Sequence, residues 1–159
     1  MELDNFFIQQ DKFNKELIID SNLNDYKVAT RMYLALQVKI SELADETKCF
    51  IYWNDSNKSR VSKQLVLEKY IDCLKQILTI GLNKNYTCLK KLIVKPNDYC
   101  LSDQFLTLLI DVNDLIISPS IDHYKTLFED FISLGISLGF SINQIEEIFF
   151  KNDCCKIAL

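Results

Sequence analysis

The stretch LALQVKISELADETKCFIYW, residues 34–53, decides the fold class of this chain. Its apolar residues recur at every third or fourth position, which is the repeat of one face of an α-helix rather than the alternation of a β-strand. Leu36, Ile40 and Leu43 share that face. Extended toward the N-terminus, the pattern predicts a long helix over residues 27–49.

Helical periodicity covers most of the remaining chain. The sequence SINQ, residues 141–144, is a capping box with Ser141 as N-cap, so a last helix begins there. Ser102 is expected to cap a helix in the same way. The segment CLKKLIVKPNDYC, residues 88–100, predicts a short helix that stops before Pro96, because a residue preceding proline avoids helical geometry. The other predicted helices span residues 3–19, 62–82, 103–117 and 121–138, and the last one runs through Phe150.

Composition supports long helices packed in one unit. The 159 residues include only 3 Gly and 2 Pro, too few for a turn-rich β protein. Hydrophobic residues make up 48% and charged residues 25%, which provides enough apolar surface for a packed core. Gly81, with polar residues soon after it, marks the end of the helix over 62–82. We therefore predict one all-α domain over residues 1–159, a compact bundle of about five to seven helices.

Charge and composition argue against several functional classes. The net charge is −4, and no basic stripe with interleaved aromatic residues occurs, so we expect no nucleic-acid partner. No apolar run is long enough to span a membrane, and the acidic start MELDNFF is unlike a signal peptide, so we expect a cytoplasmic protein without a membrane partner. Six cysteines without CxxC spacing and a single histidine argue against a zinc site.

Two of the predicted helices each carry a lysine and an acid three residues apart. Lys39 and Glu42 lie in the first of the two, and Lys69 and Asp72 in the second. Residues at this spacing share one helix face. Carboxylates presented inward from neighbouring helices are how a bundle builds a site for a hard cation such as Mg²⁺. The same pairs are also compatible with ordinary ion pairs on solvated helix faces.

Longer stretches of the chain resemble the dimeric, all-α dUTPase family, which is related to the MazG-like nucleotide pyrophosphatases. Family members carry an ExxE motif within LALxVELxELANExxxFKYW and an ExxD motif within LEEYVDxLHF, and here these segments are LALQVKISELADETKCFIYW and VLEKYIDCLKQIL. QQDKFNKEL resembles the family's QxxLDxxI, and YKTLFEDFISLGISLGFSINQIEEIFFKN its LFxxFxxLGxxLGFSxxEIEEAYxxKN. The resemblance covers nearly the whole chain. It implies a helical homodimer that converts dUTP or dUDP to dUMP with Mg²⁺.

The resemblance assigns the metal-binding acids only in part. Glu42 and Asp72 match two of the four acids that hold Mg²⁺ in the family. Lys39 and Lys69 stand at the other two positions, where family members have glutamate. The four side chains therefore carry no net formal charge, whereas the family's quartet is entirely acidic. Glu46 lies one helical turn beyond Glu42 and is expected to line the same face, which makes it a third catalytic candidate.

By the same resemblance, five residues are candidates for binding a deoxyuridine nucleotide. Gln10 matches a position associated with the nucleobase. Trp53 matches a tryptophan of the family and is as compatible with a core or interface anchor as with a stacking platform. Lys75 replaces a histidine that usually follows the second motif. Lys151 and Asn152 match a KN pair, but the NxxR segment that contacts phosphates in the family does not follow them.

Three functions are compatible with these observations. The favoured one is a degenerate dUTPase-like protein that no longer hydrolyses nucleotide and acts by binding a nucleotide or a protein partner. The first alternative is an active Mg²⁺-dependent dUTP or NTP pyrophosphatase that uses Glu42, Glu46 and Asp72. The second is a helical protein-interaction module whose resemblance reflects ancestry alone.

Overall fold

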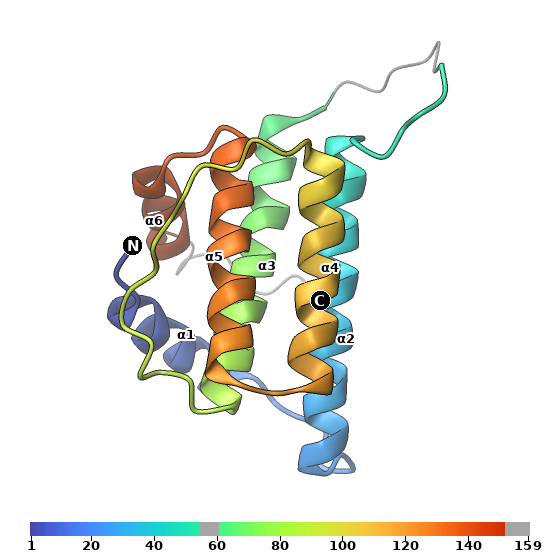
Figure 1. The fold of residues 1–159 in the computed structure, drawn as a ribbon. Coiled ribbons are helices and arrows are strands. Elements are labelled where there is room, and N and C mark those ends of the chain that lie inside the picture. Colours follow the sequence, from blue (N-terminus) through green and yellow to red (C-terminus); the bar gives the residue numbers. More distant parts are fainter. Residues whose placement is uncertain (55–60, 152–159) are drawn as a thin grey trace.

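The computed structural model describes residues 1–54 and 61–151. Within these ranges it contains six α-helices and no β-strand apart from one isolated bridge (Figure 1). The predicted all-α fold and the predicted number of helices are therefore confirmed. The helices are α1 (Asp4–Glu16), α2 (Asp25–Thr47), α3 (Lys63–Asn83), α4 (Leu101–Ile117), α5 (Ile121–Ser137) and α6 (Ile142–Lys151).

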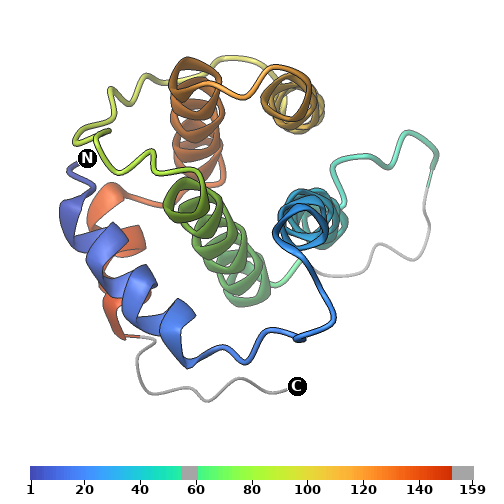
Figure 2. The same ribbon diagram turned by 90° about the horizontal axis from the view of Figure 1, so that it is seen from below.

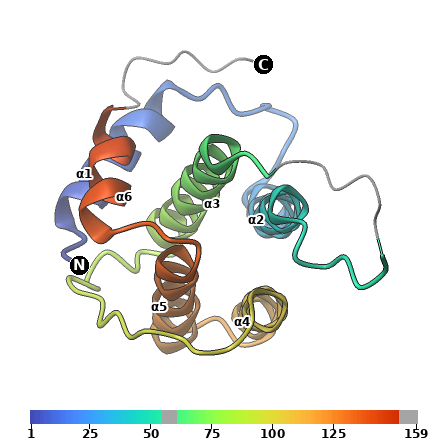
Figure 3. The ribbon, with the colours of Figure 1, turned by 90° about the horizontal axis from the view of Figure 1, so that it is seen from above.

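Helices α2 to α5 form a four-helix bundle, and α1 and α6 cover one side of it. Seen along the bundle, α3 lies between α2 on one side and the α1–α6 pair on the other (Figures 2 and 3). α2 packs against α3 and α4, and α5 packs against α4 and α3. Aromatic contacts join α1 to α6, since the ring centroids of Phe6 and Phe149 are 4.7 Å apart.

The central place of α3 explains why this helix is apolar on more than one face. It contacts α1, α2, α5 and α6, so side chains on most of its circumference are removed from water. Each large apolar side chain buried in this way contributes roughly 1.5–3 kcal/mol. Even so, no helix in the described ranges is both long and apolar enough to cross a membrane. The buried residues of α3 are Val66, Leu67, Tyr70, Ile71, Cys73, Leu74, Ile77, Leu78, Ile80 and Gly81.

Tyr70 of α3 makes two contacts with α5. Its ring stacks on that of Phe131, with centroids 4.4 Å apart and planes inclined by 10°. Its hydroxyl, fully buried, donates a hydrogen bond to the backbone carbonyl of Phe131 at 3.2 Å. One helical turn later, Gly135 leaves room for the phenol, because a Cβ atom there would overlap the Tyr70 hydroxyl.

Tyr124 makes the reciprocal contact from α5 to α3. Its buried hydroxyl donates to the carbonyl of Ile77 at 3.0 Å, and a Cβ atom at Gly81 would overlap that hydroxyl. Helix α3 ends at Asn83, in agreement with the end predicted near residue 82 and with the polar residues that mark it. Gly81 itself lies inside the helix, so its expected part in ending the helix is wrong. The glycine is needed for close packing of two helices and not for a turn.

The predicted short helix within residues 88–100 is also wrong. This segment is extended, and its backbone groups bond to the N-terminus instead of to each other. Leu3 N–H donates to the Lys90 carbonyl at 2.9 Å, and Leu92 N–H donates to the Met1 carbonyl at 3.0 Å. The side chain of Leu92 is buried in the core, so tertiary packing outweighs the helical pattern of this segment.

The two predicted serine caps have different outcomes. Ser141 caps α6 as predicted, because its hydroxyl accepts a hydrogen bond from the Gln144 N–H at 3.1 Å. Ser102 lies inside α4, whose N-cap is Cys100. The Ser102 hydroxyl donates to the carbonyl of Cys49 at 2.7 Å, so it joins α4 to the segment that follows α2.

Candidate functional site

The two lysine–acid pairs meet where α2 and α3 pack side by side. The ammonium nitrogen of Lys69 lies 2.8 Å from Oε2 of Glu42. This hydrogen bond is the main reason why the pKa of Glu42 is lowered, with smaller contributions from the charges of Lys69 and Lys39. The same bond is the main cause of the raised pKa of Lys69. Both side chains remain partly open to water, at 34% for Lys69 and 48% for Glu42.

All four motif side chains lie around one buried thiol. Cys73 of α3 is inaccessible to solvent, and burial is the main cause that raises the pKa of its thiol. The charges of Lys39, Asp72, Glu42 and Lys69 each act on that thiol as well. The structure therefore brings the four predicted residues to the same region of the α2–α3 surface.

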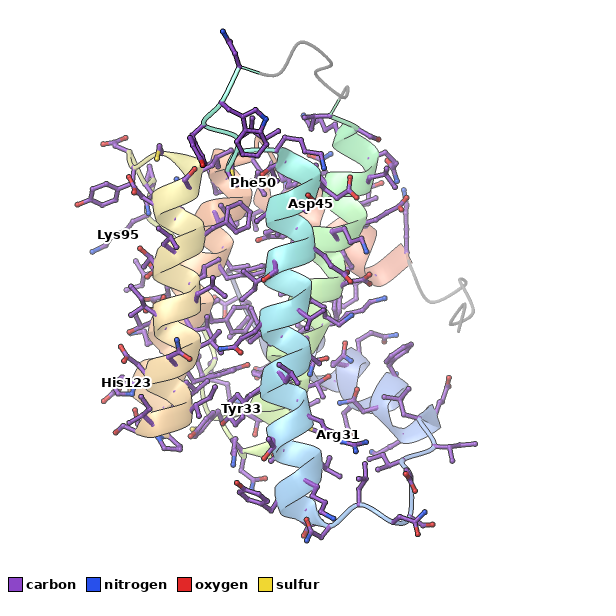
Figure 4. All side chains as sticks on the ribbon, turned by 90° about the vertical axis from the view of Figure 1, so that its right-hand side faces the viewer. Arg31, Tyr33, Asp45, Phe50, Lys95 and His123 are labelled. Carbon is purple, nitrogen blue, oxygen red and sulfur yellow. The ribbon has the colours of Figure 1, made fainter. Side chains whose placement is uncertain are left out.

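A cavity of about 550 Å³ opens beside the ion pair. Its lining includes three carboxylates and one ammonium group. Glu46 is among its lining residues, in agreement with its expected position one turn beyond Glu42. Asp45, also in the lining, lies near the upper end of α2 in Figure 4, and Phe50 lies just beyond that end. The lining residues are Gln37, Val38, Ser41, Glu42, Asp45, Glu46 and Lys69.

Sequence reasoning missed Ser41 and Asp45 as lining residues. The signal was present, because Ser41 and Asp45 follow Val38 at helical spacing and so share a face with it. Gln37 was also missed, and its amide donates to the side-chain oxygen of Asn113 on α4 at 3.1 Å. The cavity thus lies close to the contact between α2 and α4.

The side chains in this arrangement do not fit a magnesium site. Mg²⁺ requires several oxygen ligands in near-octahedral geometry. Here Glu42 is engaged by Lys69, and two of the four motif positions are lysines. Among residues 1–54 and 61–151, no group of three or more His, Cys, Asp or Glu side chains is placed to hold a metal ion.

Gln10 and Lys75 lie in a different place, at the contact between α1 and α3. Gln10 is buried, and its amide nitrogen donates to Oδ1 of Asn14 at 2.9 Å and to Oγ1 of Thr79 at 3.2 Å. The ammonium group of Lys75 lies 5.4 Å from the ring centroid of Phe13, a cation–π contact. Neither residue lines the α2–α3 cavity.

Trp53 and Lys151, the remaining nucleotide-binding candidates among the described residues, do not line the cavity either. Trp53 is 52% exposed and packs edge-on against Tyr52, with ring centroids 5.2 Å apart. Lys151 ends α6 and forms an ion pair with Glu147. Helix α6 lies across α3 from α2 (Figure 3). Asn152 falls outside the described residues.

Comparison with known proteins agrees with the resemblance seen in the sequence. A sequence model described as dUTPase matches residues 2–155, which is nearly the whole chain. Searches of curated proteins and of solved structures returned no match. The extent of the family match, together with the six-helix fold, shows that this chain belongs to the dUTPase family.

Proposed function

We propose that this dUTPase-family protein does not hydrolyse nucleotide efficiently and acts by binding a nucleotide or a protein partner at the α2–α3 cavity. The observation that carries the proposal is the 2.8 Å contact between Lys69 and Glu42. It places a fixed cation against a carboxylate that matches a metal ligand of the family. Catalytic use of Glu42, Glu46 and Asp72 would require that this ammonium group move away.

The charge balance, more than the strength of the ion pair, supports the loss of cation binding. An exposed lysine–carboxylate pair contributes only about 0.2–1 kcal/mol, which a divalent cation with good ligands would overcome. Lys39 and Lys69, however, cancel the charges of Glu42 and Asp72. A neutral quartet offers a doubly charged cation little net attraction.

A lysine at this position is a usable ligand for a phosphate group. The cavity volume of about 550 Å³ lies in the range typical of small-molecule sites. A deoxyuridine nucleotide is the ligand suggested by the family match. In this proposal Lys69 contacts phosphate oxygens, and the other contacts with the nucleotide come from residues that line the cavity. Gln10, Trp53, Lys75 and Lys151 lie outside that lining, so the proposal gives them no contact with this ligand.

The decisive experiment measures release of pyrophosphate from dUTP in the presence of Mg²⁺. The natural chain is compared with a Lys39→Glu, Lys69→Glu variant, which restores an acidic quartet. A Lys39→Gln, Lys69→Gln variant is the matched control, because it removes both ammonium groups without adding carboxylates. We expect activity only in the glutamate variant. Efficient turnover by the natural chain would overturn the proposal.

An active Mg²⁺-dependent pyrophosphatase is the second candidate. It is favoured by three carboxylates in the cavity lining, from Glu42, Asp45 and Glu46. Calorimetry with a non-hydrolysable dUTP analogue separates the two readings, because this candidate requires binding that depends on Mg²⁺. A pure interaction module would bind neither ligand. In that case neither Mg²⁺ nor nucleotide should change the melting temperature of the protein.

We also propose that the chain forms a homodimer through the adjoining faces of α2 and α4. These helices lie side by side on the face seen in Figure 4 and are joined by the Gln37–Asn113 hydrogen bond. An exposed apolar patch of this kind typically marks an association surface. A second copy is the occupant that the family match suggests. The exposed apolar residues of this face are Leu34, Val38, Leu106, Ile110 and Ile117.

Sedimentation equilibrium of the natural chain and of Ile110→Glu tests this dimer. We expect the natural chain to sediment as a dimer and the variant as a monomer, because a buried glutamate at an apolar interface is strongly unfavourable. Ile18→Glu is the control, since Ile18 is fully exposed and lies outside the α2–α4 face. A natural chain that is monomeric at all concentrations would contradict the proposal.

A further inference from the structure

Two carboxyl groups face each other across the contact between α4 and α5. Asp111 of α4 and Asp130 of α5 lie within hydrogen-bond reach of one another. The Oδ2 atom of Asp111 is shielded from solvent, and it accepts no hydrogen bond from an N–H or O–H group of the described residues. A charged oxygen in such a place is costly. A proton held between the two carboxyl groups would satisfy it.

The residues around the pair do little to neutralise two negative charges. On α4, Asp114 adds a further negative charge near Asp111. On α5, Glu129 adds one near Asp130, while His123 is the group whose charge opposes the repulsion at Asp111. Glu129 is itself engaged, because it accepts a hydrogen bond from the backbone N–H of Ile93 at 3.0 Å.

The other elements packed against this contact bring few cations to it. α2 meets α4 through the neutral Gln37, and its Arg31 lies on the side of α2 away from α4 (Figure 4). The segment over residues 93–99 and α5 supply Lys95 and Lys125, which line a cavity of about 730 Å³ together with Asp130. Lys125 lies 3.9 Å from Glu129, so part of its charge is already balanced.

These surroundings favour the protonated form of the pair. Burial is the largest cause that raises the pKa of Asp111, followed by the charge of Asp130, the hydrogen bond with Asp130 and the charge of Asp114. With the opposing charge of His123 included, the pKa of Asp111 is about 7. The pKa of Asp130 is also raised, again mainly by burial. Two carboxyl groups in contact cannot both ionise readily, so the first proton to leave is easier to lose than the second.

We propose that Asp111 and Asp130 share one proton at neutral pH and that release of this proton to solvent loosens the packing of α4 on α5. The contact between α4 and α5 would then weaken as pH rises, at a place outside the α2–α3 site. The direction follows from linkage. An acid with a raised folded-state pKa gives stability that is fully present below its unfolded value, near 4, and is lost as pH rises through the folded value.

The first test is urea unfolding of the full chain from about pH 5.5 to about pH 8.5. Below the folded-state pKa, one linked proton makes the unfolding constant rise roughly tenfold per pH unit, and the dependence flattens above it. Asp111→Asn should abolish this dependence, because its amide N–H donates permanently to the Asp130 carboxylate. Carboxyl ¹³C shifts of both aspartates, followed by NMR in the natural chain, should show one of them titrating near neutral pH.

Two controls separate the pair from other titrating groups. Asp122→Asn removes the same charge from an exposed position of α5 and should keep the natural pH dependence. His123→Gln removes the single histidine of the chain and should also keep it, with a higher midpoint because His123 lowers the pKa of Asp111. The proposal is overturned if both carboxyl groups titrate below about pH 5, or if Asp111→Asn retains the dependence of the natural chain.

Discussion

Tyr70 contacts Phe131 twice, through its ring and through its hydroxyl. The rings stack with centroids 4.4 Å apart, and the hydroxyl donates to the Phe131 carbonyl at 3.2 Å. The two contacts join α3 and α5, which are far apart in sequence, and so they fix the position of α5 on α3. Stability at this point therefore depends on one oxygen atom as well as on apolar area.

Removal of that oxygen should weaken the bundle without changing its shape. Tyr70→Phe keeps the stacked ring and loses one buried hydrogen bond, so we expect a loss of about 0.5–1.5 kcal/mol in the free energy of unfolding. Urea denaturation at neutral pH measures it. Tyr86→Phe serves as the control, since the Tyr86 ring is only partly buried. An unchanged midpoint for Tyr70→Phe would show that the hydroxyl contributes nothing net.

Gly81→Ala should destabilise the protein although alanine favours helices. Helix propensity alone predicts a gain of about 1 kcal/mol. The new Cβ, however, would overlap the Tyr124 hydroxyl, and overpacking of a core costs about 1–3 kcal/mol. We expect a net loss in thermal unfolding. Tyr124→Phe alone loses the bond to the Ile77 carbonyl, so it serves as the second background in a double-mutant cycle. The loss caused by Gly81→Ala should be smaller in the Tyr124→Phe background, and an equal loss in both backgrounds would contradict a clash at this point.

Lys69→Met should change the free energy of unfolding little at neutral pH. It should also remove the part of the acid sensitivity of that free energy that comes from Glu42. The lowered pKa of Glu42 gives stability that is present above its unfolded value, near 4.3, and is lost as pH falls through the folded value. Because the pair is partly exposed, we expect a loss of at most about 1 kcal/mol. Unfolding at neutral and at acid pH measures both effects. Lys12→Met, an exposed lysine of α1, is the control.

Ser141→Ala and Ser102→Ala should act on different parts of the chain. The first removes the N-cap of α6 and should cost about 1 kcal/mol, with local loss of α6 amide protection in hydrogen exchange. The second removes the bond to the Cys49 carbonyl, so protection should fall in the segment after α2 while the first turn of α4 is unchanged. Loss of protection at the start of α4 would mean that Ser102 stabilises that terminus after all.

The sequence was sufficient for the helices because their apolar faces repeat over many turns. Leu36, Ile40 and Leu43 were placed inward by spacing alone, and all three are buried. Local spacing failed where a distant segment competes for the same backbone groups. Lys90 and Leu92 lie in a helical pattern, yet their backbone groups bond to the N-terminus.

The site was predictable to the extent that it depends on helix faces. The two motifs were expected on neighbouring helices, but the choice of Glu42 as the partner of Lys69 depends on how α2 and α3 are aligned. The facing of Asp111 and Asp130 depends in the same way on the packing of α4 against α5. Neither aspartate has a motif or a spacing that distinguishes it in the sequence.

The tyrosine contacts give α3 and α5 an approximate twofold symmetry. Exchange of the two helices turns the Tyr70–Phe131 bond into the Tyr124–Ile77 bond, and each acceptor is followed one turn later by a glycine, Gly135 or Gly81. Within each helix, the donor tyrosine precedes the residue that accepts the other bond by the same number of positions, from Tyr70 to Ile77 and from Tyr124 to Phe131. A slide of one helix along the other would therefore stretch both bonds together. Any repacking that keeps one contact must keep the other, so the register of this helix pair is defined twice.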